Sequence, residues 1–326
     1  MKKGYLFICL AALLYGTQEI AGKYLATGAD MDPVQVTFLA FVVGTLILLP
    51  LAVREMRQKH LKLGVKDWAY LIPEGILCVP IAMLCLQFAV THTTAAKSAV
   101  VFCSNAIWTI PVAVWLLKSK ITHSDVAAMI VAIVGVVVIY NPISLIEGTT
   151  SRNNIIGMTY ALVAAVAWAF FNVIGKKRIG YYGQYVFNFL CFLVGVIVLL
   201  GMILIQHRPI LSGIHTAPAV LILLYMGIFI KGFSYIFYFG ALKEEGAVKT
   251  SMTFLIKPAL ATILAIILLH EVISWNMVVG IILVIAASSI SFYSGWKAEH
   301  RDKAIAAPPT DPQVADAVEP ATASAR

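Results

Sequence analysis

The chain has 326 residues, of which 60% are hydrophobic and only 12% are charged, and its mean hydropathy is +0.89. This composition excludes a water-soluble globule, which needs far more polar surface. The net charge of +8 does not indicate nucleic-acid binding, because the basic residues fall mainly in the gaps between apolar runs. These runs are rich in Leu, Ile, Val and Ala and predict helices in a lipid bilayer, where every backbone amide must be paired within its own segment.

We expect ten such spans, each about as long as a bilayer requires. The first resembles a signal peptide at its start but lacks a small-residue cleavage site, so it is expected to remain as a helix. The fold class is therefore an all-α integral membrane protein with ten transmembrane helices. In chain order the spans are 4–26, 34–53, 67–90, 94–117, 123–141, 155–176, 184–206, 217–240, 247–269 and 274–296.

The basic residues predict the orientation, since short cytoplasmic connections are enriched in Lys and Arg. The alternate connections carry Asp30, Asp32 and Glu147 instead. We therefore expect an inner (plasma) membrane location with both termini in the cytoplasm. The cytoplasmic basic residues are Lys2, Lys3, Arg54, Arg57, Lys59, Lys62, Lys66, Lys118, Lys120, Lys176, Lys177, Arg178, Lys243, Lys297, Arg301 and Lys303.

The chain nearly repeats itself at an offset of about 152 residues, at which Lys97 falls on Lys249 and Ala89 on Ala241. An offset that stays almost constant along the chain predicts two related halves. Five spans are an odd number, so the second half must be inserted upside down, as in transporters with inverted repeats. The expected domains are a first repeat at 1–146, a second repeat at 154–296 and a disordered cytoplasmic tail at 297–326, which is rich in Ala, Pro and Thr.

The segment 241–271 combines a small-residue turn, a central proline (Pro258) and an acidic residue that closes the helix (Glu271), and Gly280 opens a second apolar run. This pattern over about residues 4–296 resembles the EamA-type branch of the drug/metabolite transporter superfamily. The first half departs from it, because Ser119 stands where the second half has Glu271. The resemblance implies a helix broken at Pro258 and a central cavity lined by spans 1–4 and 6–9, with spans 5 and 10 outside.

Charged residues near the middle of a span are costly and therefore candidates for function. Lys257 lies about midway along span 9, and the repeat pairs it with Asn105 in span 4. Lys97 precedes Asn105 by eight residues and Lys249 precedes Lys257 by eight, so each lysine shares a helical face with the later residue of its span. Together the four residues predict a basic, hydrogen-bonding site for an anionic group. For Lys97 and Lys249 the alternative is that they extend to opposite membrane faces.

Lys231 lies in the middle of span 8 among aromatic residues. It is expected either to bind substrate or to pair with Glu19 or Glu74. Aromatic residues inside the spans are expected mostly to pack, with Tyr15 and Tyr235 as candidates for contact with substrate.

Glu19 is the candidate for proton coupling, since an apolar setting favours the neutral form of a carboxyl group. The alternative is an ion pair with Lys23, four residues later on the same helix.

These residues predict a secondary transporter that moves a small organic metabolite, anionic or zwitterionic, by alternating access driven by a proton or by exchange. One alternative is an efflux carrier for cationic drugs or amines, which would use Glu19 and aromatic rings. The other is a non-transporting scaffold or an intramembrane enzyme, although the sequence has no catalytic motif, metal-ligand spacing or cofactor motif.

The expected partners are the lipid bilayer and a small-molecule substrate, and no nucleic acid. Spans 5 and 10 carry small residues at matching places, Ala128 with Gly280 and Gly135 with Ala287. Such residues allow close helix approach, either in a homodimer through helices 5 and 10 or within the protomer.

Overall fold

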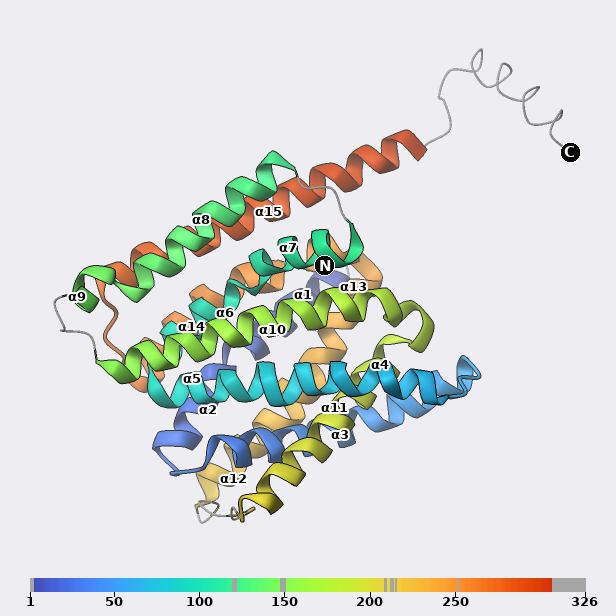
Figure 1. Ribbon diagram of the computed structural model, residues 1–326, viewed down its shortest axis with the longest axis horizontal. Coiled ribbons are helices and arrows are strands. Elements are labelled where there is room, and N and C mark those ends of the chain that lie inside the picture. Colours follow the sequence, from blue (N-terminus) through green and yellow to red (C-terminus); the bar gives the residue numbers. More distant parts are fainter. Residues whose placement is uncertain are drawn as a thin grey trace, which may run out of the picture.

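The computed structural model describes residues 3–118, 122–146, 151–207, 210–211, 214, 216–250 and 252–306. Within these residues the chain forms helices and no strand (Figure 1). Nine helical segments of this part of the chain are long and apolar enough to cross a membrane, and a shorter apolar helix, Thr253–Leu269, stands where the ninth span is expected. The expected all-α membrane class with ten spans is confirmed.

In the first half, three of the five spans are built from more than one helical segment. In chain order, the five spans are formed by α1 (Lys3–Gly16) with α2 (Gln18–Thr27), by α3 (Pro33–Gln58), by α4 (Val65–Ile76) with η1 (Leu77–Met83) and α5 (Leu84–His92), by α6 (Ala95–Cys103) with α7 (Asn105–Leu117), and by α8 (His123–Tyr140). The short helix α9 (Pro142–Ile146) follows α8.

Among the described residues of the second half, only the third span is divided. The helices are α10 (Arg152–Tyr182), α11 (Gln184–Ile205), α12 (Ala217–Tyr225) with η2 (Met226–Phe233) and α13 (Ser234–Thr250), α14 (Met252–Leu269) and α15 (Trp275–Ala306). Helix α15 continues past the expected end of the last span at 296. Residues 307–326 of the expected tail lie outside the described part of the chain.

Local sequence signals fix several helix starts. Asp32 caps α3 by accepting from the Val34 amide at 2.8 Å, with Pro33 in the first turn. Thr94 caps α6 by accepting from the Lys97 amide at 3.2 Å. These caps satisfy amides that a helix cannot pair internally, and they set where the connections end.

The third span of each half contains a π-helical segment, η1 or η2, at nearly equivalent positions of the repeat. Pro80 lies inside η1 and removes an amide donor there. A π-helical segment widens the helix, and such segments are frequent at functional sites. Both fall beside the pocket described below.

Close packing repeats between the halves with the same offset as the sequence. A Cβ added at Gly44 would stand 2.6 Å from the Cβ of Lys231, and one added at Gly195 would collide with the Cβ of Val79. Gly44 and Gly195 are equivalent in the repeat, and so are Lys231 and Val79. The second span of each half therefore contacts the third span of the other half at a glycine.

A second pair of glycines shows the same symmetry. A Cβ at Gly75 would stand 2.8 Å from the Cys191 carbonyl oxygen, and one at Gly227 would stand 3.2 Å from the Ala40 carbonyl oxygen. These contacts join the two halves by backbone-to-backbone approach, which only small residues permit.

Helices α8 and α15 lie side by side along one edge of the bundle (Figure 1). Their contact uses the predicted small residues, since a Cβ at Gly135 would stand 3.0 Å from the Cβ of Leu283 and 3.4 Å from the Gly280 carbonyl oxygen. These two glycines therefore pack within the protomer.

The expected break at Pro258 is not found, because α14 is helical from Met252 to Leu269. The Pro258 carbonyl oxygen accepts from the Thr262 hydroxyl at 2.8 Å. In the first half, by contrast, the equivalent span is divided at Ser104, between α6 and α7. A proline on one face of a helix that neighbouring helices support does not have to end it.

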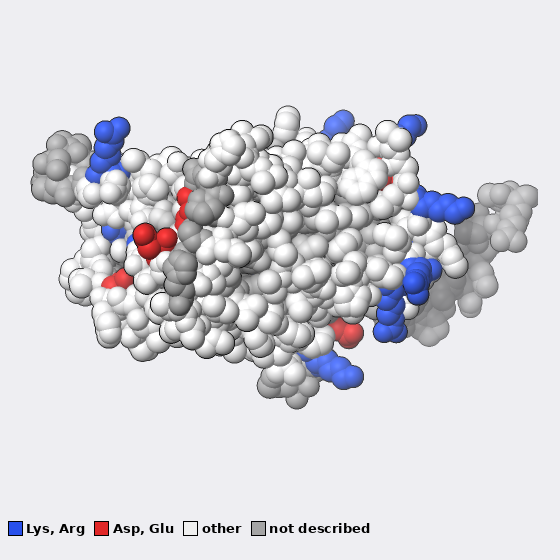
Figure 2. All heavy atoms as spheres, turned by 90° about the horizontal axis from the view of Figure 1, so that it is seen from below, with Lys and Arg blue, Asp and Glu red and all other residues white. Residues whose placement is uncertain are grey.

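The face in Figure 2 shows Lys, Arg, Asp and Glu side chains toward the two ends of the molecule and a wide band between them without charged residues. Because the helices run between these ends, the band has the form expected for the part of the surface in contact with lipid.

We predict that Gly195→Ala lowers the free energy of unfolding by about 1–3 kcal/mol, because the new methyl group overpacks the contact with Val79. Gly201→Ala on the same helix is the matched control, since nothing lies within 4 Å of its added Cβ. Thermal unfolding of both variants in detergent checks this expectation. Equal midpoints for the two variants would contradict the close contact between the halves.

Candidate functional site

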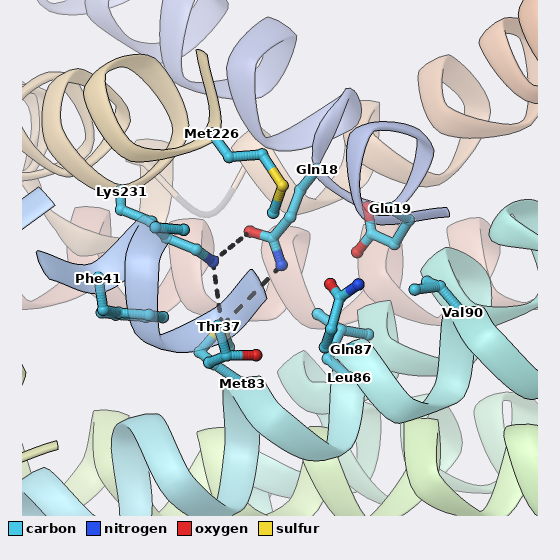
Figure 3. A pocket seen from close by; sticks show the side chains of 11 residues that line it. Gln18, Glu19, Thr37, Phe41, Met83, Leu86, Gln87, Val90, Met226 and Lys231 are labelled. Carbon is cyan, nitrogen blue, oxygen red and sulfur yellow. Dashed lines mark hydrogen bonds between the residues drawn. The ribbon is translucent and has the colours of Figure 1, made fainter. Parts of the chain in front are cut away.

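A pocket lies between α2, α3, η1, α5 and η2 (Figure 3). Its cavity volume is about 10 Å³, which is room for about one water molecule, so the pocket is nearly closed in this conformation. Most of the lining comes from the first half, and the second half contributes two residues. The lining residues are Gln18, Glu19, Thr37, Ala40, Phe41, Met83, Leu86, Gln87, Val90, Met226 and Lys231.

Lys231 places a buried ammonium group in this pocket, with the side chain only 3% exposed. Its Nζ donates to Gln18 Oε1 at 3.1 Å and to Met83 Sδ at 3.5 Å, and lies 4.9 Å from the centre of the Phe41 ring. All three partners are neutral. Among the described residues Lys231 forms no ion pair, so neither of its expected carboxylate partners is used.

Glu19 and Lys257 form a buried ion pair, with 2.7 Å between Glu19 Oε1 and Lys257 Nζ. Both side chains are almost fully buried, and the Lys257 ammonium lies 4.6 Å from the centre of the Phe102 ring. The pair joins α2 of the first half to α14 of the second. The alternative pairing with Lys23 is not formed, because Lys23 donates to the Thr93 carbonyl oxygen at 2.9 Å.

The second carboxylate oxygen of Glu19 has no hydrogen-bond partner although it is buried. The nearby Gln87 amide donates to the Gly22 carbonyl oxygen at 3.0 Å. A buried acceptor without a donor is rare and costs the full desolvation free energy of the group. Glu19 also lines the pocket, so a residue of the lining holds a carboxylate oxygen that lacks a donor in this conformation.

Asn105 is buried at the start of α7 and donates from Nδ2 to the Phe102 carbonyl oxygen at 2.7 Å. The same Phe102 carries the Lys257 ammonium on its ring. The two residues that the repeat pairs are thus linked through Phe102, and Asn105 is not among the residues that line the pocket.

Tyr15 and Tyr235 lie in a buried aromatic cluster beside the pocket. Their ring centres are 5.8 Å apart, and the Tyr235 ring is 6.3 Å from that of Trp168 and 4.9 Å from that of Phe192. Neither tyrosine is among the lining residues, so in this conformation both pack.

Lys97 lies in the first turn of α6 and is half-buried, away from the pocket. Its ammonium lies in the field of the Glu271 carboxylate. Glu271 accepts from the amides of Ala95 at 2.6 Å and Ala96 at 3.1 Å, so the end of α14 caps the start of α6. The side chain of Lys249 lies outside the part of the chain that the structure describes.

The opposite end of the bundle carries a similar closure. Glu55, near the end of α3, accepts from the amides of Tyr185 at 2.8 Å and Val186 at 3.1 Å at the start of α11. We call these two regions the Glu271 end and the Glu55 end. At each end a carboxylate from one half closes on a helix start of the other half.

Sequence reasoning missed four polar or polarizable lining residues, Gln18, Thr37, Met83 and Gln87. Gln18 and Gln87 stand inside apolar runs, which is a usable signal. Met83 gives no such signal, because a methionine in a span is ordinary.

These features define a class of protein: an all-helical membrane protein whose polar pocket lies at the contact between two related halves, as in secondary transporters. Comparison with known proteins agrees. Residues 2–141 and 155–293 match the model of the EamA-like transporter family. An uncharacterized transporter of Clostridium kluyveri is 52% identical over 303 residues, covering 93% of this chain and 97% of the relative.

More distant relatives match over almost the same length. An uncharacterized transporter of Archaeoglobus fulgidus is 24% identical over 280 residues, covering 86% of this chain and 95% of the relative. A solved crystal structure at 18% identity covers 88% of this chain and 96% of its own, with a TM-score of 0.62, which supports the fold alone. The chain belongs to the EamA-like transporter family and is a membrane transporter.

We predict that Lys257→Ala lowers the free energy of unfolding by about 3–5 kcal/mol, because it leaves the Glu19 carboxylate buried without a cation. The double variant Glu19→Gln, Lys257→Met removes both charges and should recover most of that loss. Thermal unfolding in detergent measures both. If the double variant is as unstable as the single one, the two residues do not act as a pair.

Proposed function

We propose that this transporter moves a small organic metabolite, anionic or zwitterionic, across the inner membrane by secondary active transport with alternating access. The buried Lys231 ammonium, held only by neutral groups, is the observation that carries the proposal. A lone charge inside a membrane protein is costly, and a cargo carboxylate would replace weak partners with a charge-assisted hydrogen bond.

The polar contacts of the site support a coupling between binding and movement of the halves. Gln18 and Glu19 belong to the first half, and their partners Lys231 and Lys257 belong to the second. A cargo that competes for either lysine changes contacts across the boundary along which alternating access requires the halves to move.

The two ends supply the closures that such a cycle needs. Glu271 ties α14 to α6 at one end, and Glu55 ties α3 to α11 at the other. Each closure consists of hydrogen bonds to a helix start, which break and re-form without disturbing a packed core. We assign the Glu55 end to the cytoplasm, with both chain termini, because its neighbouring connections are rich in Lys and Arg.

Glu19 is the proposed site of proton coupling. Protonation of its carboxylate would remove the negative partner of Lys257 and free that ammonium for cargo. Exchange of one cargo molecule for another is the other way to drive the cycle.

The alternative function is efflux of cationic drugs or amines, and the free oxygen of Glu19 is the feature that favours it. Two buried lysines against one carboxylate at the site oppose it, because a cation would enter a region of positive charge. A scaffold or an intramembrane enzyme is disfavoured by the family, and a carrier role explains the buried lysines.

We predict that Lys231→Met weakens binding of an anionic cargo by roughly 10–100-fold, the loss expected for one charge-assisted hydrogen bond, while stability changes little. A metabolite panel screened by thermal shift identifies the cargo, since ligands stabilise the state they bind. Counterflow in proteoliposomes then measures its transport.

Lys62→Met is the control, because Lys62 is an exposed lysine in the connection between α3 and α4. Unchanged flux of an anionic cargo through the Lys231→Met protein would contradict the proposal. So would a bound cargo that the wild-type protein does not transport.

A further inference from the structure

The pocket offers two recognition points of opposite sign, and they lie on different sides of it. Figure 3 shows Lys231 reaching in from one side and Glu19 from the other, with Gln18 between them. Resting on the proposed function, we propose that the cargo is a zwitterion, whose carboxylate binds Lys231 and whose ammonium binds the free carboxylate oxygen of Glu19.

The proposed binding point for the cargo carboxylate rests on the weak hydrogen bonding of the Lys231 ammonium group. An ammonium group has three donors, and here one meets an amide oxygen and another a thioether sulfur, which is a weak acceptor. A cargo carboxylate displaces the sulfur contact at little cost. It also allows Gln18 to turn its amide and donate to the second carboxylate oxygen.

The proposed binding point for the cargo ammonium rests on the different contacts of the two carboxylate oxygens of Glu19. One oxygen is held at 2.7 Å by Lys257, which fixes the orientation of the carboxylate, while the other is buried and accepts nothing. A cargo ammonium supplies the missing donor.

The other lining residues indicate the polarity of the cargo atoms outside its carboxylate and ammonium groups. Ala40, Phe41, Leu86, Val90 and Met226 present apolar groups, and Thr37 and Gln87 are the other polar residues of the lining. The structure therefore favours a small amino-carboxylate whose remaining atoms are largely apolar.

Matched triplets test this inference. Each contains a zwitterion, the acid without its amine and the amine without its acid: L-alanine, propionate and ethylamine; L-leucine, isocaproate and isoamylamine; L-phenylalanine, hydrocinnamate and phenethylamine. Binding to the purified full-length protein is measured by calorimetry and thermal shift. For at least one triplet we expect the zwitterion to bind at least tenfold more tightly than either analogue.

The variants assign the two points separately. Lys231→Met should abolish the advantage of the zwitterion over the amine, and Glu19→Gln should abolish its advantage over the acid. Should Glu19→Gln fail to fold because Lys257 is left unpaired, the double variant Glu19→Gln, Lys257→Met carries the same test. Lys62→Met should retain the wild-type order.

The outcomes separate this inference from the proposed function. Acids that bind as tightly as the zwitterions, with no effect of Glu19→Gln, would overturn the zwitterion inference and leave an anion carrier. Amines that bind most tightly, or no binding in any triplet, would also overturn it. A zwitterion that binds in the predicted pattern but shows no counterflow in proteoliposomes would instead overturn transport.

Discussion

The ion pair between Glu19 and Lys257 imposes the main constraint on this molecule. Two charges removed from water are costly unless their geometry is good, and either one alone would be far more costly. The pair therefore requires α2 and α14, which come from different halves, to stay in contact while it exists. Gln18, which precedes Glu19 in α2, accepts a hydrogen bond from Lys231 of the second half. The buried polar contacts at the pocket therefore link the two halves.

The repeat provides the frame for these links, and individual substitutions provide their chemistry. Glycine contacts recur between the halves with the sequence offset, so the backbones are related. The polar residues are not: Lys231 stands where the first half has Val79, and Lys257 stands where it has Asn105. Helix packing needs the small residues at both places, whereas a binding site needs charge at only one. An asymmetric ligand site can therefore form on a nearly symmetric scaffold.

Much of the fold could be predicted from the sequence, because hydrophobic length and basic connections report directly on the bilayer. The intramembrane position of Lys257, Lys231 and Glu19 was also evident from their apolar surroundings. Their partners were not, since Glu19 had a plausible cation one helical turn away in Lys23, and only the packing of α14 against α2 decides between the two lysines.

The limits of helical periodicity explain other differences. The tyrosines at 15 and 235 have the same local signal whether they line a pocket or pack beside it, and the three-dimensional contacts decide. By spacing, Lys97 shares a helical face with Asn105. The helix is divided at Ser104, between α6 and α7, so a spacing of eight residues no longer places the two side chains on the same face. Pro258 shows the converse, because a residue that usually interrupts a helix is accommodated in α14.

The π-helical segments η1 and η2 have a consequence for how these two spans can change. Successive residues of an α-helix are about 100° apart around the axis, and a wide turn accommodates an extra residue within that progression. If η2 relaxed to a regular helix, α13 would swivel by about that angle relative to α12, and Lys231, which lies within η2, would leave its present bearing. Each half thus has a wide turn at a place where rotation of the helical segment that follows it would redirect side chains at the pocket.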